Sequence, residues 1–195
     1  KTKEHQEIAR KFGKEFFDGT RDTGYGGFKY DKRFWDLVVQ DFIKYYNLNN
    51  NSSILDVGCG KGFMLYDFSR YLPKAKITGI DISEYAIENS IDQMKDSLFV
   101  ADCKSLPFKD NEFDLVISIN TIHNHELENC SKSISEIERV SKKDSFIVVD
   151  AYNSEAEKES LFSWNLTAKT ILHTSEWKKL FEDNKFSGDY YWFCP

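Results

Sequence analysis

The chain has 195 residues, 41% of them hydrophobic and 30% charged, which fits one soluble domain built around a layered core. Its formal net charge of −6 would repel nucleic-acid phosphates, and its longest apolar runs are only strand-sized, so neither a nucleic-acid partner nor a membrane span is expected. Four cysteines lie apart without a CxxC pair, which argues against a zinc site and a dense disulfide scaffold and favours a reducing cytoplasm.

The first 50 residues are predicted to form an N-terminal helical segment. Apolar side chains at every fourth position predict a helix over about 4–17. Four glycines follow within 19–27 and predict a loop whose backbone can take positive φ. A second helix is predicted over about 32–46. Because glycine lets a segment move, this loop is the leading candidate for a lid over the rest of the domain.

From residue 53 onward, short apolar runs alternate with helical segments. The predicted strands are 54–57, 77–80, 98–101, 113–119 and 145–149, and the predicted helices are 61–71, 84–95 and one carried by Ile134, Ile137 and Val140. This alternation is typical of βαβ units, whose parallel strands are covered on both faces. We therefore predict a doubly wound α/β fold with a mostly parallel sheet, centred on residues 51–152.

The C-terminal part, 153–195, is predicted to lie on the substrate side of the domain. Helices are expected near 154–163 and 175–184, an irregular segment at 164–170, and a final aromatic strand at 190–193. Repeats, low-complexity stretches and interdomain linkers are not found in the sequence. Residues 1–195 are therefore interpreted as a single domain.

A glycine-rich turn follows the first predicted strand, in the segment Asp56-Val57-Gly58-Cys59-Gly60-Lys61-Gly62. Glycine lets a ligand approach the backbone closely, and the N–H groups of a new helix favour a carboxylate. Asp81 ends the next predicted strand, where an acid can accept protons from both hydroxyls of a ribose. A dinucleotide fingerprint would require Gly or Ala at position 63, which is Phe, and an apolar residue in place of Asp56. The pattern therefore disfavours a nicotinamide or flavin site.

These residues resemble the first motif of the class I S-adenosylmethionine (SAM)-dependent methyltransferases, which reads apolar-apolar-Asp-apolar-Gly-x-Gly-x-Gly. The likeness extends from about 53 to 150 and implies a Rossmann-like methyltransferase fold with a seven-stranded type of sheet. It also implies SAM as cofactor and S-adenosylhomocysteine as product. The segment Leu106-Pro107-Phe108, followed by Phe113-Asp114-Leu115-Val116, is similar to the small-molecule branch related to quinone-biosynthesis methyltransferases.

The resemblance carries over a set of cofactor-binding residues. The glycines would flank the methionine part of SAM, Asp81 would bind the ribose, and Asp102 would face the adenine amino group. The full predicted set is Asp56, Gly58, Cys59, Gly60, Gly62, Asp81, Ile82, Asp102, Cys103 and Asn120. A structural alternative remains open for each acid: a residue of a tight turn, or a charged residue next to a helix.

The acceptor is expected at the end of the fourth core strand, which reads Ser118-Ile119-Asn120-Thr121-Ile122-His123-Asn124-His125. His123 is the candidate catalytic base, because an unperturbed imidazole titrates near neutral pH. The family often has Glu-His at 123–124, and both histidines could instead bond locally at a helix start. A metal is not predicted, since no third ligand lies nearby in sequence. The remaining candidate substrate-binding residues are Tyr25, Tyr30, Trp164 and Asn165, with core packing as the alternative for Trp164.

Methyl transfer to O, N or C of a small-molecule acceptor is the function that this reading favours. A protein acceptor is a second hypothesis, because one exposed side chain could enter a cleft. A third is a SAM-binding protein of the same fold without methyl transfer, and the unusual His123-Asn124-His125 end supports it. The sequence leaves open the acceptor, the methylated atom and the oligomeric state.

Overall fold

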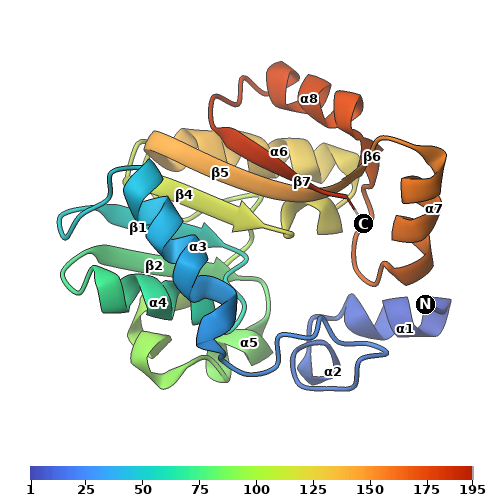
Figure 1. Cartoon of the computed structure of the whole chain (residues 1–195), viewed down its shortest axis with the longest axis horizontal. Coiled ribbons are helices and arrows are strands. Elements are labelled where there is room, and N and C mark those ends of the chain that lie inside the picture. Colours follow the sequence, from blue (N-terminus) through green and yellow to red (C-terminus); the bar gives the residue numbers. More distant parts are fainter. Residues whose placement is uncertain (195) are drawn as a thin grey trace.

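The computed structural model describes residues 1–194, so residue 195 of the predicted C-terminal part lies outside the described residues. An open seven-stranded sheet crosses the domain in the order β3-β2-β1-β4-β5-β6, with β7 also paired to β5 (Figure 1). Each of these pairings is parallel. The strands are β1 (Ser53–Val57), β2 (Lys76–Asp81), β3 (Leu98–Val100), β4 (Phe113–Ile119), β5 (Ser141–Tyr152), β6 (Leu172–His173) and β7 (Asp189–Phe193). The predicted fold class is confirmed.

Helices connect these strands. They are α1 (Lys3–Ala9), α2 (Lys14–Phe17), α3 (Lys32–Tyr45), α4 (Phe63–Tyr71), α5 (Glu84–Glu88), α6 (Leu127–Val140), α7 (Glu155–Trp164) and α8 (Thr174–Asp183), with short 3₁₀ turns η1 (Asp92–Ser97) and η2 (Ile122–Asn124). None of the described helices combines the length and apolar character needed to cross a bilayer.

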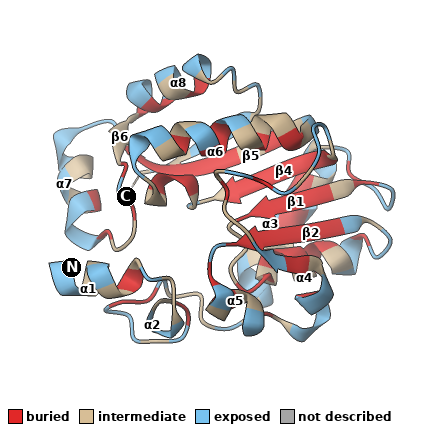
Figure 2. Cartoon of the chain, turned by 180° about the vertical axis from the view of Figure 1, so that it is seen from behind, coloured by how far each residue is buried: buried red, intermediate tan, exposed pale blue. Residues whose placement is uncertain are grey.

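The sheet separates two hydrophobic cores, one on each face. One core joins α3 and α4 to residues such as Ile54 and Leu115 of the central strands. The other joins α6 and α8 to Leu55 and Val116, their immediate neighbours in sequence. Successive strand residues therefore face opposite cores, as the period of two requires, and the central strands are buried along their length (Figure 2). This double burial explains why the central strands read as continuous apolar runs.

The first predicted helix, 4–17, is wrong as a single element. It is divided into α1 and α2 at Phe12, whose φ is +49°, and Gly13. The Ser83 hydroxyl donates to the Phe12 carbonyl oxygen at 2.5 Å, and this contact with the loop after β2 fixes the bend. The break places Phe17, which is 4% exposed, among the buried residues.

The helix predicted over 84–95 is also shorter than expected. It ends at Glu88, and 3₁₀ geometry follows from Asp92. The backbone N–H of Ile91 donates to the Lys61 carbonyl at 3.0 Å instead of continuing the helical ladder. A long-range hydrogen bond thus replaces the local one at this point.

The N-terminal segment is divided between two places. Helix α3 packs against α4 on the sheet, whereas α1 lies beside α7 and α2 contacts α5 (Figure 1). The side chain of Gln6 donates to the Asn165 carbonyl at 3.0 Å, and Arg10 donates to the carbonyls of Thr167 and Ala168. The part of 1–50 that is placed to act as a lid is therefore α1, α2 and the glycine loop after them, and this role stays a prediction.

Candidate active site

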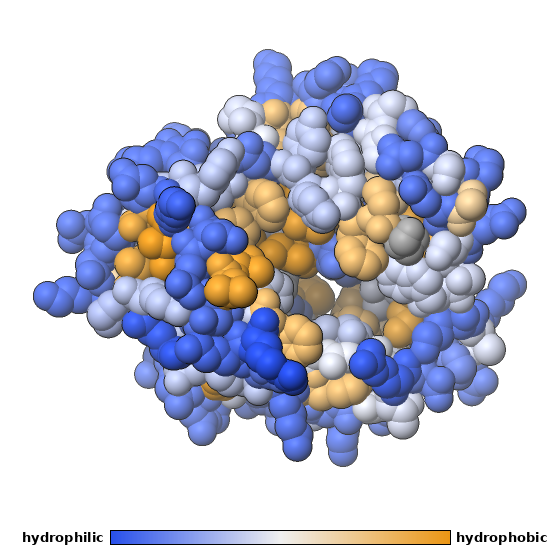
Figure 3. All heavy atoms as spheres, in the orientation of Figure 1, coloured by the Kyte–Doolittle hydropathy of each residue, from blue (hydrophilic) through white to orange (hydrophobic). Residues whose placement is uncertain are grey.

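A cavity of about 880 Å³ opens at the carboxyl edge of the sheet. Its walls come from the ends of β1, β2, β4 and β5, from the loops after β1, β2, β3 and β4, from the N-terminal segment and from the end of α7 with the residues after it. The space-filling view shows hydrophobic residues gathered around a hollow near the centre of this face, with hydrophilic residues at its periphery (Figure 3). The volume is at the upper end of the range for small-molecule sites, so two small ligands fit side by side.

The glycine-rich turn forms the floor of this cavity. Gly58, Gly60 and Gly62 have φ values of +89°, +53° and +79°, a region that favours glycine. The N–H groups of Gly58 and Cys59 both donate to the Ile80 carbonyl, at 2.7 and 2.9 Å. These bonds tie the end of β1 to the end of β2. The turn is therefore held in one shape before any ligand arrives.

Replacing Gly58 with alanine is expected to distort this turn. A Cβ at Gly58 would lie 2.0 Å from Thr121 Oγ1, and the positive φ adds strain. We expect a loss of about 1–3 kcal/mol in the free energy of unfolding, measured by urea denaturation, together with weaker cofactor binding in calorimetry. Gly13→Ala is the matched control, because a Cβ there meets nothing within 4 Å. Equal effects of the two substitutions would contradict this account of the turn.

Three carboxylates, those of Asp56, Asp81 and Asp102, line the cavity at the carboxyl edge of the sheet. Burial, followed by the nearby charge of Asp81, raises the pKa of Asp56 to about 8. Burial also raises the pKa of Asp81, although its carboxylate accepts from the N–H groups of Gly60 and Ser83 at 2.8 and 2.9 Å. At Asp102, burial is outweighed by the backbone and side chain of Lys104, so its pKa is lowered.

The Asp56 carboxyl lines the cavity and has no cationic partner among residues 1–194. A buried acid without a partner favours a ligand that brings a positive charge. The ammonium and sulfonium groups of SAM are such charges, and the remaining lone pairs of Asp81 can accept from ribose hydroxyls. The residues present therefore fit this cofactor.

Most of the predicted cofactor residues do line the cavity. They are Asp56, Gly58, Cys59, Gly60, Asp81, Ile82, Asp102, Cys103 and Asn120. Gly62 does not: it caps the start of α4, and a Cβ there would meet the Leu98 side chain at 2.7 Å. The third glycine is thus required by packing between helix and strand, and its contact with the cofactor stays a prediction that its place outside the cavity lining does not support.

A second group of polar residues stands after β4 and at the end of β5. The backbone N–H of Asp150 donates to His123 Nδ1 at 2.9 Å, and His123 Nε2 lies 3.8 Å from the Asp150 carboxylate. Burial lowers the pKa of His123 to about 3 and raises that of Asp150 to about 6. Because Nδ1 accepts, the neutral imidazole carries its proton on Nε2 and acts as a donor. The role of base for His123 stays a prediction, and the Asp150 carboxylate beside it is a second group that can accept a proton.

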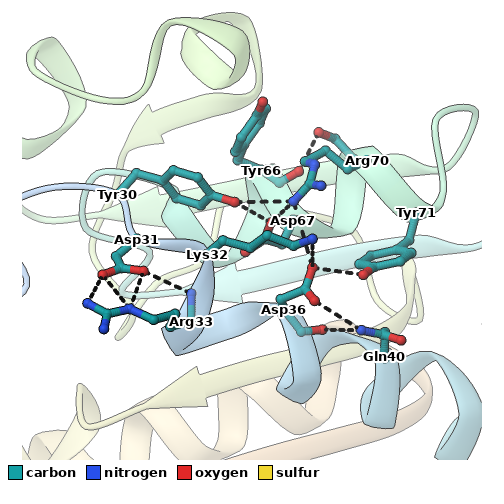
Figure 4. Close-up of polar contacts among 11 residues, drawn as sticks. Tyr30, Asp31, Lys32, Arg33, Asp36, Gln40, Tyr66, Asp67, Arg70 and Tyr71 are labelled. Atoms are coloured by element: carbon teal, nitrogen blue, oxygen red, sulfur yellow. Dashed lines mark hydrogen bonds and ion pairs between the residues drawn. The ribbon is translucent and has the colours of Figure 1, made fainter.

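Of the predicted substrate-binding residues, some line the cavity and one does not. Tyr25, His123, Trp164 and Asn165 line the cavity, but Tyr30 does not. The Tyr30 hydroxyl donates to Asp67 at 2.6 Å and accepts from Arg70, within a network that joins α3 to α4 (Figure 4). The Tyr30 hydroxyl thus joins the segment before α3 to α4 outside the cavity, and its role as a substrate ligand stays a prediction that this placement does not support.

Trp164 and Asn165 form part of the cavity wall in different ways. The Trp164 side chain is 40% exposed and meets Phe193 edge to face, so it is not a core residue. The Asn165 amide is buried and closes a turn, since it donates to the Ala168 carbonyl and accepts from the Ala168 N–H. Trp164 is therefore free to contact an acceptor, whereas the polar group of Asn165 is already engaged.

Three functional candidates were missed at the level of sequence. Asp150 stands at the end of β5, and the rule that places ligands at carboxyl ends of strands could have found it. The Lys61 ammonium, 8% exposed, pairs with Asp18 at 2.5 Å and so attaches the N-terminal segment to the glycine turn. Arg21 lines the cavity and has no acidic partner in the described part of the chain. Nothing in the local sequence marks these last two.

The fold and the cavity define a nucleotide-cofactor site of the Rossmann-like type. A family model described as a methyltransferase domain matches residues 48–185, and the chain belongs to this methyltransferase family. The predicted resemblance to class I SAM-dependent methyltransferases is thereby confirmed.

Individual relatives are distant and longer than this chain. A tRNA (carboxymethyluridine(34)-5-O)-methyltransferase of Arabidopsis thaliana is 35% identical over 136 residues, which cover 67% of this chain and 31% of the plant protein. A ubiquinone/menaquinone biosynthesis C-methyltransferase, UbiE, of Citrifermentans bemidjiense is 32% identical over 115 residues, 55% of this chain and 48% of that protein. The YcgJ protein of Bacillus subtilis shares the fold, with a TM-score of 0.60 at 21% identity over 75% of this chain and 66% of its own. The chain thus spans 31% and 48% of the lengths of the two sequence relatives named here.

Proposed function

We propose that this domain transfers the methyl group of SAM to an O, N or C atom of a small-molecule acceptor. The observation that carries the proposal is the continuity of one cavity. The glycine turn and the carboxylates Asp56, Asp81 and Asp102 line one end, and His123 and Asp150 line the other. A cofactor held at the first end would therefore present its reactive group toward a buried pair of proton-handling side chains.

The cofactor supplies an activated methyl group, and the residues of the chain supply position and proton transfer. The glycine turn and Asp81 fix the cofactor, and the hydrophobic walls exclude water from the reacting atoms. Asp150, with a pKa near 6, is ionised at neutral pH and can accept a proton from an acceptor hydroxyl or ammonium group. His123 donates from Nε2 and can orient the acceptor or the Asp150 carboxylate.

An acidic, partly aromatic acceptor is the best match for the free part of the cavity. Arg21 offers a guanidinium for a carboxylate or phosphate, and Trp164 and Phe193 offer aromatic surfaces. Asn124 Oδ1 is buried without a hydrogen-bond partner in the described chain, which suits an additional donor on a ligand. A nucleic-acid acceptor of the kind named for the plant relative is disfavoured by the net charge of −6. The four free cysteines support a reducing, cytoplasmic setting.

Methyl incorporation from SAM with a labelled methyl group tests the proposal. The purified chain is incubated with a panel of small hydroxy, amino and aromatic carboxylic acids, and S-adenosylhomocysteine is quantified. Label in a small molecule, lost in Asp81→Ala, is the expected result. Label found only in protein or tRNA would overturn the small-molecule acceptor, and SAM binding without any turnover would favour a binding protein of the same fold.

A further inference from the structure

A cysteine, a histidine and an aspartate meet at the cavity wall, although they are far apart in sequence. Asp102 and Cys103 follow β3, whereas His125 follows η2 after β4. One ligand atom from each side chain lies within 4.8 Å of the others. We propose that these three residues bind a divalent cation of the thiol-preferring class, with Zn²⁺ as the probe. The expectation of no metal considered only neighbours in sequence, and for that reason overlooked this cluster.

The distance between the cysteine and histidine ligand atoms is close to that of tetrahedral coordination. Cys103 Sγ lies 3.2 Å from His125 Nε2. Zinc bonds of about 2.3 Å to sulfur and about 2.0–2.1 Å to nitrogen place two ligand atoms roughly 3.5 Å apart in a tetrahedral site. The pair therefore needs only a few tenths of an ångström of adjustment to admit the ion. Cysteine, histidine and carboxylate are all established zinc ligands.

The burial of the three groups suits a site that is open on one side. Cys103 is buried, Asp102 and His125 are half-buried, and all three line the cavity. Three protein ligands would hold the ion, and the fourth position would face the cavity, where water or a ligand can enter. A competing ion pair exists between Asp102 and the Lys104 ammonium, 3.1 Å apart. Because Lys104 is about one-third exposed, its side chain can move away when a cation arrives.

The surrounding contacts keep the cluster in place without the ion. The Thr170 hydroxyl donates to the His125 carbonyl at 2.7 Å, and Ser133 Oγ lies 3.2 Å from Cys103 Sγ. The loop after Cys103 is tied to α6, where Glu136 accepts from the Leu106 N–H and Arg139 donates to the Leu106 carbonyl. Such second contacts orient metal ligands and raise affinity.

A catalytic thiol is the competing explanation for a cysteine beside a histidine. A reactive cysteine needs an environment that lowers the pKa of its thiol. Here burial raises the pKa of Cys103 to about 11, and burial lowers that of His125. A protonated thiol beside a neutral imidazole is not an activated nucleophile, but it becomes a ligand pair once a metal displaces the thiol proton.

Cation binding would oppose cofactor binding, and this consequence rests on the proposed function. Asp102 is the predicted partner of the adenine amino group, and a cation bound to its carboxylate would compete with adenine for the charge and lone pairs of that group. Binding of Zn²⁺ at the cluster is thus expected to weaken the affinity for S-adenosylhomocysteine. Chelation would restore it.

Titration of the reduced, metal-free protein with Zn²⁺ against a chromophoric chelator tests the site. One equivalent is expected to bind, and Cys103→Ser and His125→Gln should each weaken it by about tenfold or more. Co²⁺ should give a thiolate-to-metal charge-transfer band that is lost in Cys103→Ser. Cys194→Ser is the matched control, since that thiol lies outside the cavity lining, and it should bind Zn²⁺ as the parent does.

Two results would overturn the site: no stoichiometric Zn²⁺ binding, or equal affinity in the parent and both cluster variants. Calorimetry with S-adenosylhomocysteine in the presence of a chelator reports on the cofactor site alone. If the proposed function is wrong, that calorimetry will detect no binding of S-adenosylhomocysteine. The Zn²⁺ titration still tests the metal site independently of that result.

Discussion

Replacement of Asp150 by asparagine is expected to lower kcat by about 10²- to 10⁴-fold for any acceptor that must lose a proton. The carboxylate is buried beside His123 in the cavity wall, and its pKa of about 6 leaves it ionised at neutral pH. The parent kcat should therefore fall as the pH drops below 6, because the carboxylate becomes protonated. Steady-state kinetics between pH 5 and 8 measure both effects.

Asp96→Asn serves as the control for the Asp150 substitution, since that carboxylate is exposed on η1 and is not part of the cavity wall. SAM affinity in Asp150→Asn should stay within about twofold, because the predicted cofactor contacts do not include this residue. An unchanged kcat in Asp150→Asn, or a parent kcat that is flat through pH 6, would show that no base acts from this position.

SAM affinity is expected to rise with pH, by up to about tenfold per unit between pH 6 and 8. Burial and the charge of Asp81 raise the pKa of Asp56 to about 8, so the free protein holds a proton there at neutral pH. A cationic ligand favours the ionised carboxylate and expels that proton. Calorimetry in two buffers of different ionisation enthalpy should record the release of up to about one proton per SAM bound.

Two variants separate Asp56 from the other carboxylates. Asp56→Asn should bind SAM more weakly at pH 8 and lose the pH dependence. Asp102→Asn should weaken binding to a similar extent at every pH, because the pKa of Asp102 is lowered and it is already ionised. A pH dependence that survives in Asp56→Asn would assign the proton to a different group.

Sequence reasoning succeeded where local pattern and tertiary burial agree. The strand predicted over 113–119 is β4 with the same bounds, because a central parallel strand is buried on both faces and reads as one apolar run. The glycine turn could also be predicted from sequence, since its positive φ values depend on local backbone geometry. In both cases a few consecutive residues determine the local structure.

It failed where a contact between distant segments decides the outcome. The helix over 4–17 breaks at Phe12 because Ser83, 71 residues away, binds its carbonyl. The direction of the Tyr30 side chain depends on Asp67, which the glycine loop around it does not reveal. The same applies to the His123–Asp150 pair and to the cluster of Asp102, Cys103 and His125, whose members gather only when the carboxyl edge of the sheet is complete.

The parallel order of the sheet also bears on how quickly this protein can fold. Strand β1 pairs with β4, which begins about 60 residues further along the chain, so the wall between Asp56 and His123 requires closure of a long loop. Domains dominated by such distant pairings reach the native state in milliseconds to seconds, more slowly than helical bundles. During refolding, the capacity to bind ligand should therefore recover together with the slow phase of sheet formation and not with the earlier helical signal.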